Sequence, residues 1–158
     1  MKIKQTTLMA AALWFTTAAV SFAEVSVQAG TWKLDEAKSK FSAGATKNNM
    51  VTYNEDKKTH VTNVAVEGVN SEGQPVKWTW TGKMDGKAYK VKGSPVVDQI
   101  AYKKMSSHMN ELTAMKDGKV VMTGTVKVAK DGKSRVVATT RTDASGQKMN
   151  DEAYYNKQ

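Results

Sequence analysis

Apolar and polar residues alternate one by one along most of the chain. The stretch KWTWTGKMDGKAYKVKG, residues 77–93, shows this alternation most clearly. Successive side chains of a β-strand point to opposite faces, so a period of two predicts a strand with one buried and one solvent-exposed face. Between Pro75 and Gly82 the apolar set is Val76, Trp78 and Trp80, and the polar set is Lys77, Thr79 and Thr81. We therefore predict that both tryptophans face the core.

The same alternation recurs in the rest of the chain after residue 23. No stretch there keeps the 3.6-residue period of an amphipathic helix. The pattern therefore predicts an all-β protein. Further residues on predicted buried faces are Val64 and Val66, Ile100 and Tyr102, and Met122.

Short turn signals separate these runs at regular intervals. Examples are MDGK at 84–87, KDGK at 116–119 and 130–133, and ASGQ at 144–147. Asp-Gly and Ser-Gly pairs tolerate the positive φ of tight hairpins, and strands joined by tight hairpins are antiparallel neighbours. Closing such a sheet removes both exposed edges. We predict an antiparallel up-and-down β-barrel of about eight to ten strands, favoured over a two-sheet sandwich because long crossover connections are missing.

Ten strand positions follow from the alternation and the turn signals. The longest irregular stretch, residues 35–48, is expected to hold one helical turn or to lie across a barrel mouth as a lid. The two prolines stand at predicted strand starts, where a missing N–H is tolerated. The predicted strands are 30–34, 49–55, 59–69, 75–83, 88–93, 97–104, 108–115, 119–129, 133–142 and 147–156.

The first 23 residues have the composition of a cleavable secretory signal peptide. Lys2 and Lys4 precede an apolar stretch at 8–20, and a small residue, Ala23, ends the segment. The apolar stretch is too short to span a bilayer as a helix. We expect cleavage after Ala23, a single domain over residues 24–158, and a periplasmic or secreted protein. The chain has no cysteine, so we do not expect a lipoprotein.

The chain is strongly basic and has no means of forming a disulfide. It carries 24 Lys and Arg against 15 Asp and Glu, which gives a net charge of +9 at pH 7. An exported protein of this size without cysteine must be stabilised by apolar burial and sheet hydrogen bonds.

The two ends of the predicted domain resemble a known family. Gly30-Thr31-Trp32 resembles the G-x-W signature of the lipocalins, and GTWKLDEAKSKF together with the closing YYNKQ is similar to the ends of lipocalins and fatty-acid-binding proteins, the calycin group. The whole domain also looks like small exported bacterial lipocalin-like proteins of uncharacterised function. The resemblance implies that Trp32 packs at the barrel bottom against a basic residue of the last strands. Arg141 and Arg135 are candidates, and we assign Arg141 to this bottom with Gly30 and Trp32.

The resemblance further implies a small apolar ligand, lipid or fatty-acid-like, inside the barrel. The residues alone leave open whether the interior holds a cavity or is a filled core, because large aromatic side chains stabilise a small domain by burial alone. A filled core would make the protein purely structural or stress-related. The interior ligand-binding residues we assign are Trp78, Trp80, Tyr102, Met122, Val64 and Val66.

A second binding hypothesis starts from lysines on predicted solvent faces. A positive barrel surface would attract an anionic partner such as lipid head groups or acidic polysaccharide. Nothing in the pattern indicates nucleic acid specifically. Exposed lysines also prevent edge pairing and keep a protein soluble, so this explanation stays open beside the functional one. The lysines are Lys77, Lys83, Lys87, Lys90, Lys92, Lys103, Lys104 and Lys127.

The residues capable of catalysis do not form an enzyme motif. His60 and His108 stand in separate segments, and the H-x-x-x-H, G-x-S-x-G and glycine-rich phosphate-loop motifs are missing. We therefore expect a non-enzymatic binding protein, with no catalytic residue, no metal and no cofactor.

Overall fold

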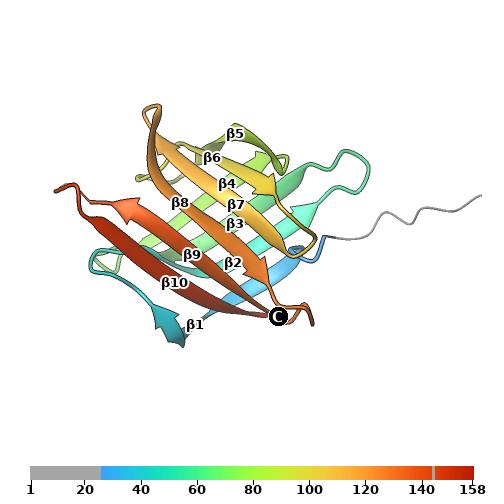
Figure 1. Cartoon of the computed structure of the whole chain (residues 1–158), viewed down its shortest axis with the longest axis horizontal. Coiled ribbons are helices and arrows are strands. Elements are labelled where there is room, and N and C mark those ends of the chain that lie inside the picture. Colours follow the sequence, from blue (N-terminus) through green and yellow to red (C-terminus); the bar gives the residue numbers. More distant parts are fainter. Residues whose placement is uncertain (1–25, 144) are drawn as a thin grey trace, which may run out of the picture.

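Ten β-strands follow one another along the described part of the chain and form one closed barrel (Figure 1). The computed structural model describes residues 26–143 and 145–158; the predicted signal peptide, residues 1–23, lies outside them. Within this described part no helix is long and apolar enough to cross a membrane. The strands are β1 Gly30–Lys40, β2 Lys47–Glu55, β3 Thr62–Val69, β4 Pro75–Gly82, β5 Asp85–Lys92, β6 Gln99–Lys104, β7 Met109–Lys116, β8 Lys119–Val128, β9 Ser134–Thr142 and β10 Lys148–Lys157.

Every strand pairs antiparallel with the next one in sequence, and the first pairs with the last. Leu34 of β1 lies opposite Tyr155 of β10, and this pairing closes the ring β1-β10-β9-β8-β7-β6-β5-β4-β3-β2. A closed ring leaves no free edge for another chain to pair with. The predicted all-β, up-and-down antiparallel barrel is confirmed, with ten strands.

Side chains alternate between the barrel interior and solvent as the sequence pattern predicts. Along β3, Val64 and Val66 are buried while Ala65 and Glu67 are exposed. Along β4 the two tryptophans share the inner face, Trp80 fully buried and Trp78 half-buried. The inner face of the closed sheet is therefore the hydrophobic core.

The Asp-Gly turn signals act in two different ways. Asp117 and Gly118 both have positive φ, 51° and 73°, and connect β7 to β8 as a two-residue hairpin turn. Asp85 and Gly86, predicted as a hairpin turn, instead lie inside β5. The pairing of β5 with β6 shifts register there, and Gly86, with a φ of 82°, accommodates the resulting bulge.

The irregular stretch predicted for residues 35–48 is shorter than expected. β1 continues to Lys40, so the connection to β2 covers only residues 41–46. The register against β10 shifts between Asp35 and Lys40, and within this bulge Ser39 Oγ donates a hydrogen bond to the Asp35 carbonyl at 2.7 Å. The bulge interrupts the alternation of apolar and polar residues, which is why the pattern did not predict a strand there.

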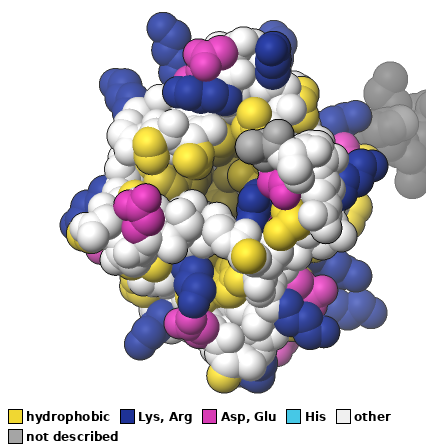
Figure 2. Space-filling view, turned by 90° about the vertical axis from the view of Figure 1, so that its left-hand side faces the viewer, with side chains coloured by type: hydrophobic (Ala, Val, Ile, Leu, Met, Phe, Trp, Pro, Cys, Tyr) yellow, Lys and Arg dark blue, Asp and Glu magenta, His cyan; other side chains and the backbone are white. Residues whose placement is uncertain are grey.

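The two ends of the barrel differ. At the end where β1 starts, the bottom, the segment 26–29 covers the interior and the Trp32 Nε1–H donates to the Gln28 carbonyl at 2.8 Å. Because strands alternate in direction, the β1–β2, β3–β4, β5–β6, β7–β8 and β9–β10 connections all lie at the opposite end, the mouth, on the left in Figure 1. Figure 2 looks at the mouth and shows a hollow with apolar walls and both basic and acidic side chains around its rim.

The lower half of the core is packed around aromatic rings. The Trp80 ring meets the Tyr102 ring edge-on at 4.9 Å between centroids and the Tyr89 ring at 5.8 Å. Its Nε1–H donates to the Ile100 carbonyl at 2.9 Å, so the polar atom of the indole is satisfied in the interior.

Replacing Trp80 with alanine should lower the free energy of unfolding by about 3 to 5 kcal/mol, because it removes a fully buried indole and leaves a cavity. Urea unfolding followed by circular dichroism measures the loss. The matched control is Thr79→Ala, the adjacent exposed position on the same strand, which should change stability by less than about 0.5 kcal/mol. Equal losses for the two variants would contradict the inward placement of Trp80.

Candidate ligand-binding site

A cavity of about 360 Å³ extends from the mouth toward the barrel bottom and opens at the hollow of Figure 2. This volume falls in the range of sites that hold small ligands. Strands from all around the ring contribute to its walls, which are mainly apolar. Main wall residues are Val66, Trp78, Ile100, Tyr102, Leu112, Ala114, Met122, Val126, Val137 and Ala153.

Four of the six predicted interior residues line this cavity: Trp78, Tyr102, Met122 and Val66. The other two, Trp80 and Val64, lie in the barrel interior but do not line the cavity. Both are buried and pair with each other across β3 and β4, deeper in the barrel. A period of two identifies the inner face of a strand but not the depth of a residue inside the barrel, so these two residues belong to the packed core.

Arg135, not Arg141, packs against Trp32 at the barrel bottom. The Arg135 Cζ lies 4.8 Å from the Trp32 ring centroid, 4.9 Å from that of Tyr53 and 4.8 Å from that of Tyr155. The assignment of Arg141 to this place is corrected: β9 runs from the bottom to the mouth, so Arg135 lies near its start and Arg141 near its end.

Gly30 and Trp32 lie at the bottom, at the start of β1. The chain enters β1 at Gly30 with a φ of 116°, a conformation that side-chain-bearing residues rarely adopt. A Cβ on Gly30 would come within 2.7 Å of Lys157 Cε, and the Lys157 ammonium lies 5.1 Å from the centroid of the Trp32 ring. The glycine therefore allows the last strand to pack over the tryptophan.

Three buried phenols, Tyr53, Tyr102 and Tyr155, line the cavity together with Arg135. Burial raises the pKa of Tyr102 well above its usual value; the neighbouring Tyr53 adds to the rise and Arg135 opposes it. Burial likewise raises the pKa of Tyr155 to about 12, again against the influence of Arg135. These two phenols stay protonated at neutral pH and remain hydrogen-bond donors. The inner end of the apolar cavity is therefore polar.

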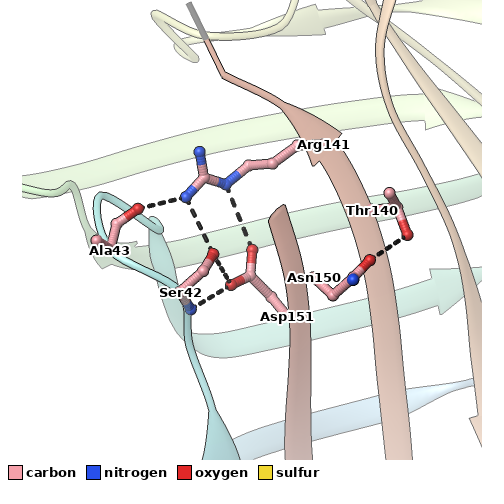
Figure 3. Close-up of polar contacts among 6 residues, drawn as sticks. All are labelled: Ser42, Ala43, Thr140, Arg141, Asn150 and Asp151. Atoms are coloured by element: carbon pink, nitrogen blue, oxygen red, sulfur yellow. Dashed lines mark hydrogen bonds and ion pairs between the residues drawn. The ribbon is translucent and has the colours of Figure 1, made fainter. Parts of the chain in front are cut away.

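A second polar group stands at the mouth (Figure 3). Asp151 Oδ1 accepts hydrogen bonds from the Ser42 backbone N–H at 2.7 Å and from Ser42 Oγ at 2.6 Å. Arg141 Nη2 donates to the Ala43 carbonyl at 2.6 Å, and Arg141 Nε lies 3.4 Å from Asp151 Oδ2. These contacts tie the β1–β2 connection to β9 and β10. We call the three side chains Ser42, Asp151 and Arg141 the mouth latch.

Several residues of the site were not assigned from the sequence. Tyr53 and Tyr155 follow the same alternation as their strands, so the signal for them was present. Ser42 and Asp151 are 109 residues apart, and no local pattern indicates their contact.

The chain matches no family model and no curated protein. Among solved structures, it is similar in fold to EF1p2_mFAP2b bound to DFHBI, with 8% identity, a TM-score of 0.45, and 84% of this chain and 94% of that chain covered. It is also similar to a redesigned β-barrel, mFAP1, bound to DFHBI, with 11% identity, a TM-score of 0.44, and 81% and 94% covered. A third is a barrel from the de novo design of a fluorescence-activating β-barrel, with 16% identity, a TM-score of 0.41, and 85% and 100% covered. Similarity at this level says nothing about what this chain binds.

Replacing Asp151 with alanine should loosen the β1–β2 connection, because Ser42 and Arg141 lose their shared acceptor at once. Hydrogen exchange at the amides of residues 41–46 should become about tenfold faster or more, as expected for losing a charge-assisted hydrogen bond. The control is Thr140→Ala, which removes only the 2.8 Å hydrogen bond to Asn150 beside the latch. Unchanged exchange in the Asp151 variant would show that the latch does not hold this connection.

Proposed function

We propose that the protein is an exported, non-enzymatic binding protein that holds one small, largely apolar ligand inside its barrel. The observation that carries this proposal is the cavity of about 360 Å³, which is apolar in its walls and open at one end of a closed sheet. A filled core would leave no such space.

The walls of the cavity suit an apolar molecule better than a polar one. Apolar surface gains roughly 25 cal/mol for each Å² removed from water, so an apolar ligand is stabilised along the whole length of these walls. Trp78, half-buried in the wall, offers a large flat surface for contact. The barrel is closed without the ligand, so the site is largely formed beforehand.

Export and the absence of catalysis belong to the same proposal. The composition of residues 1–23 supports secretion to a periplasm or to the outside. His60 and His108 lie in turns at the bottom end, and neither lines the cavity. The contact of Trp32 with Arg135 supports a lipocalin-like relationship, because it has the form that the G-x-W resemblance implies.

Replacing Ala114 with phenylalanine should weaken the binding of an uncharged apolar dye such as Nile red at least tenfold, because Ala114 is fully buried in the cavity wall and the new ring fills the space. Titration followed by dye and tryptophan fluorescence measures the affinity.

The matched control for this variant is Ala65→Phe, the same substitution on the exposed face of β3. It should leave the affinity within about twofold of the wild type. If the wild-type protein does not bind the dye saturably, the proposed function fails. It also fails if Ala114→Phe and Ala65→Phe bind the dye equally, because the dye then does not occupy the cavity.

A second candidate function places an anionic lipid surface at the mouth. Val96 and Val120, in the β5–β6 connection and beside the β7–β8 turn, are 56% and 59% exposed. Lysines flank them: Lys119 precedes Val120, and Lys92 ends the strand that leads into the loop of Val96. All eight lysines named from the sequence are also exposed, most of them on β5 and β6. Apolar tips among lysines favour contact with a negatively charged membrane.

The double variant Val96→Asp, Val120→Asp should lose most of its co-flotation with vesicles of phosphatidylglycerol, because it places negative charge at the apolar tips. Met105→Asp is the control, since Met105 is a 45% exposed apolar side chain at the opposite end. Wild-type flotation should fall as salt rises past about 0.15 M. Absence of wild-type flotation at low salt would remove this second function and leave the cavity untouched.

A further inference from the structure

Arg135 is a buried cation to which the described part of the chain supplies no anionic partner. Its side chain lines the cavity at the bottom, with 2% of the residue exposed. The Nε and Nη1 atoms are fully buried and have no hydrogen-bond partner among residues 26–143 and 145–158. The other arginine of the chain, Arg141, lies on the same strand and pairs with Asp151.

The aromatic rings around Arg135 compensate its charge only in part. The rings of Trp32, Tyr53 and Tyr155 have their centroids between 4.8 and 4.9 Å from Cζ, a distance at which they attract the cation. The N–H donors of a guanidinium lie in its plane, and a ring offers them no lone pair. A buried donor without an acceptor is costly, and a buried charge without a counter-charge is more so.

We propose that the ligand carries a single carboxylate, which enters first and binds Arg135 at the inner end of the cavity while an apolar chain extends toward the mouth. This inference rests on the proposed function and names the chemical class of the ligand. A carboxylate matches the fork of guanidinium donors. The hydroxyls of Tyr53, Tyr102 and Tyr155 stand around the same inner end and supply further donors.

One guanidinium favours a head group with one negative charge. The described residues give Arg135 no ion pair, and no second cation lines the inner half of the cavity, since Arg141 lies at the mouth. A phosphate with two charges would therefore leave one of them buried and uncompensated. The apolar walls above the tyrosines suit an unbranched or aromatic hydrocarbon body.

The test compares dodecanoate with 1-dodecanol, which share one chain and differ in the charged group. Displacement of Nile red from the wild-type protein should show the acid binding at least tenfold more tightly than the alcohol. In Arg135→Met, which keeps a long apolar side chain, the ratio should fall to about one. Lys127→Met, an exposed position on β8, is the matched control and should keep the wild-type ratio.

The outcomes separate this inference from the function on which it rests. Equal binding of acid and alcohol to the wild type overturns the carboxylate site and leaves the apolar carrier intact, whereas binding of neither overturns both. Loss of the acid preference in Arg141→Met but not in Arg135→Met places the head group at the mouth and also overturns the inference. Should Arg135→Met not fold, Tyr102→Phe serves in its place: it should weaken the acid several-fold and spare the alcohol, and equal effects on both would overturn the site.

Discussion

The pairing of β1 with β10 is the constraint on which the rest of the molecule depends. This pairing closes a series of hairpins into a barrel, and only a closed barrel encloses an interior. Because neighbouring strands pair their backbone groups around the circumference, the interior is left to side chains. Trp32, Arg135 and Tyr155 stand where this closure is made, so the same strands that shut the ring also build its floor.

The size of the inward side chains explains why the bottom of the interior is packed while a cavity remains above it. Near the bottom the inner face presents Trp32, Trp80 and Tyr155: the Trp80 ring packs against Tyr102, and the other two rings pack against the Arg135 guanidinium. Around the cavity it presents smaller residues such as Ala114, Val126 and Ala153. Ten strands enclose more room than these small side chains can fill, and the remaining space is the cavity.

Much of this architecture could be predicted from the sequence, because a strand's period and a hairpin's glycine are local signals. The strand order, the inward tryptophans and most strand limits follow from them. Local signals did not predict the second half of β1, because polar residues at 35–40 break the alternation at the bulge. They also did not predict how deep a residue lies in the barrel: Trp80 and Trp78 share the inner face, but only Trp78 lines the cavity. Strand direction alone decides which arginine lies at the bottom. Every odd-numbered strand starts at the end where Trp32 lies, so β9 brings Arg135, and not Arg141, to that end. The latch contact of Ser42 with Asp151 could not be predicted, since it depends on the closed ring.

Arg135 can serve the fold and a ligand at the same time because the two roles use different parts of the guanidinium. The faces of the group attract the aromatic rings that close the bottom, and this attraction needs only charge and proximity. The in-plane donors are not used by those rings, and the surroundings offer neutral phenols in place of a carboxylate. If the only purpose were to fill the floor, an apolar side chain of similar volume would do so without the cost of burying a charge. Keeping a cation beside the cavity is therefore better explained by something that enters the cavity with the opposite charge.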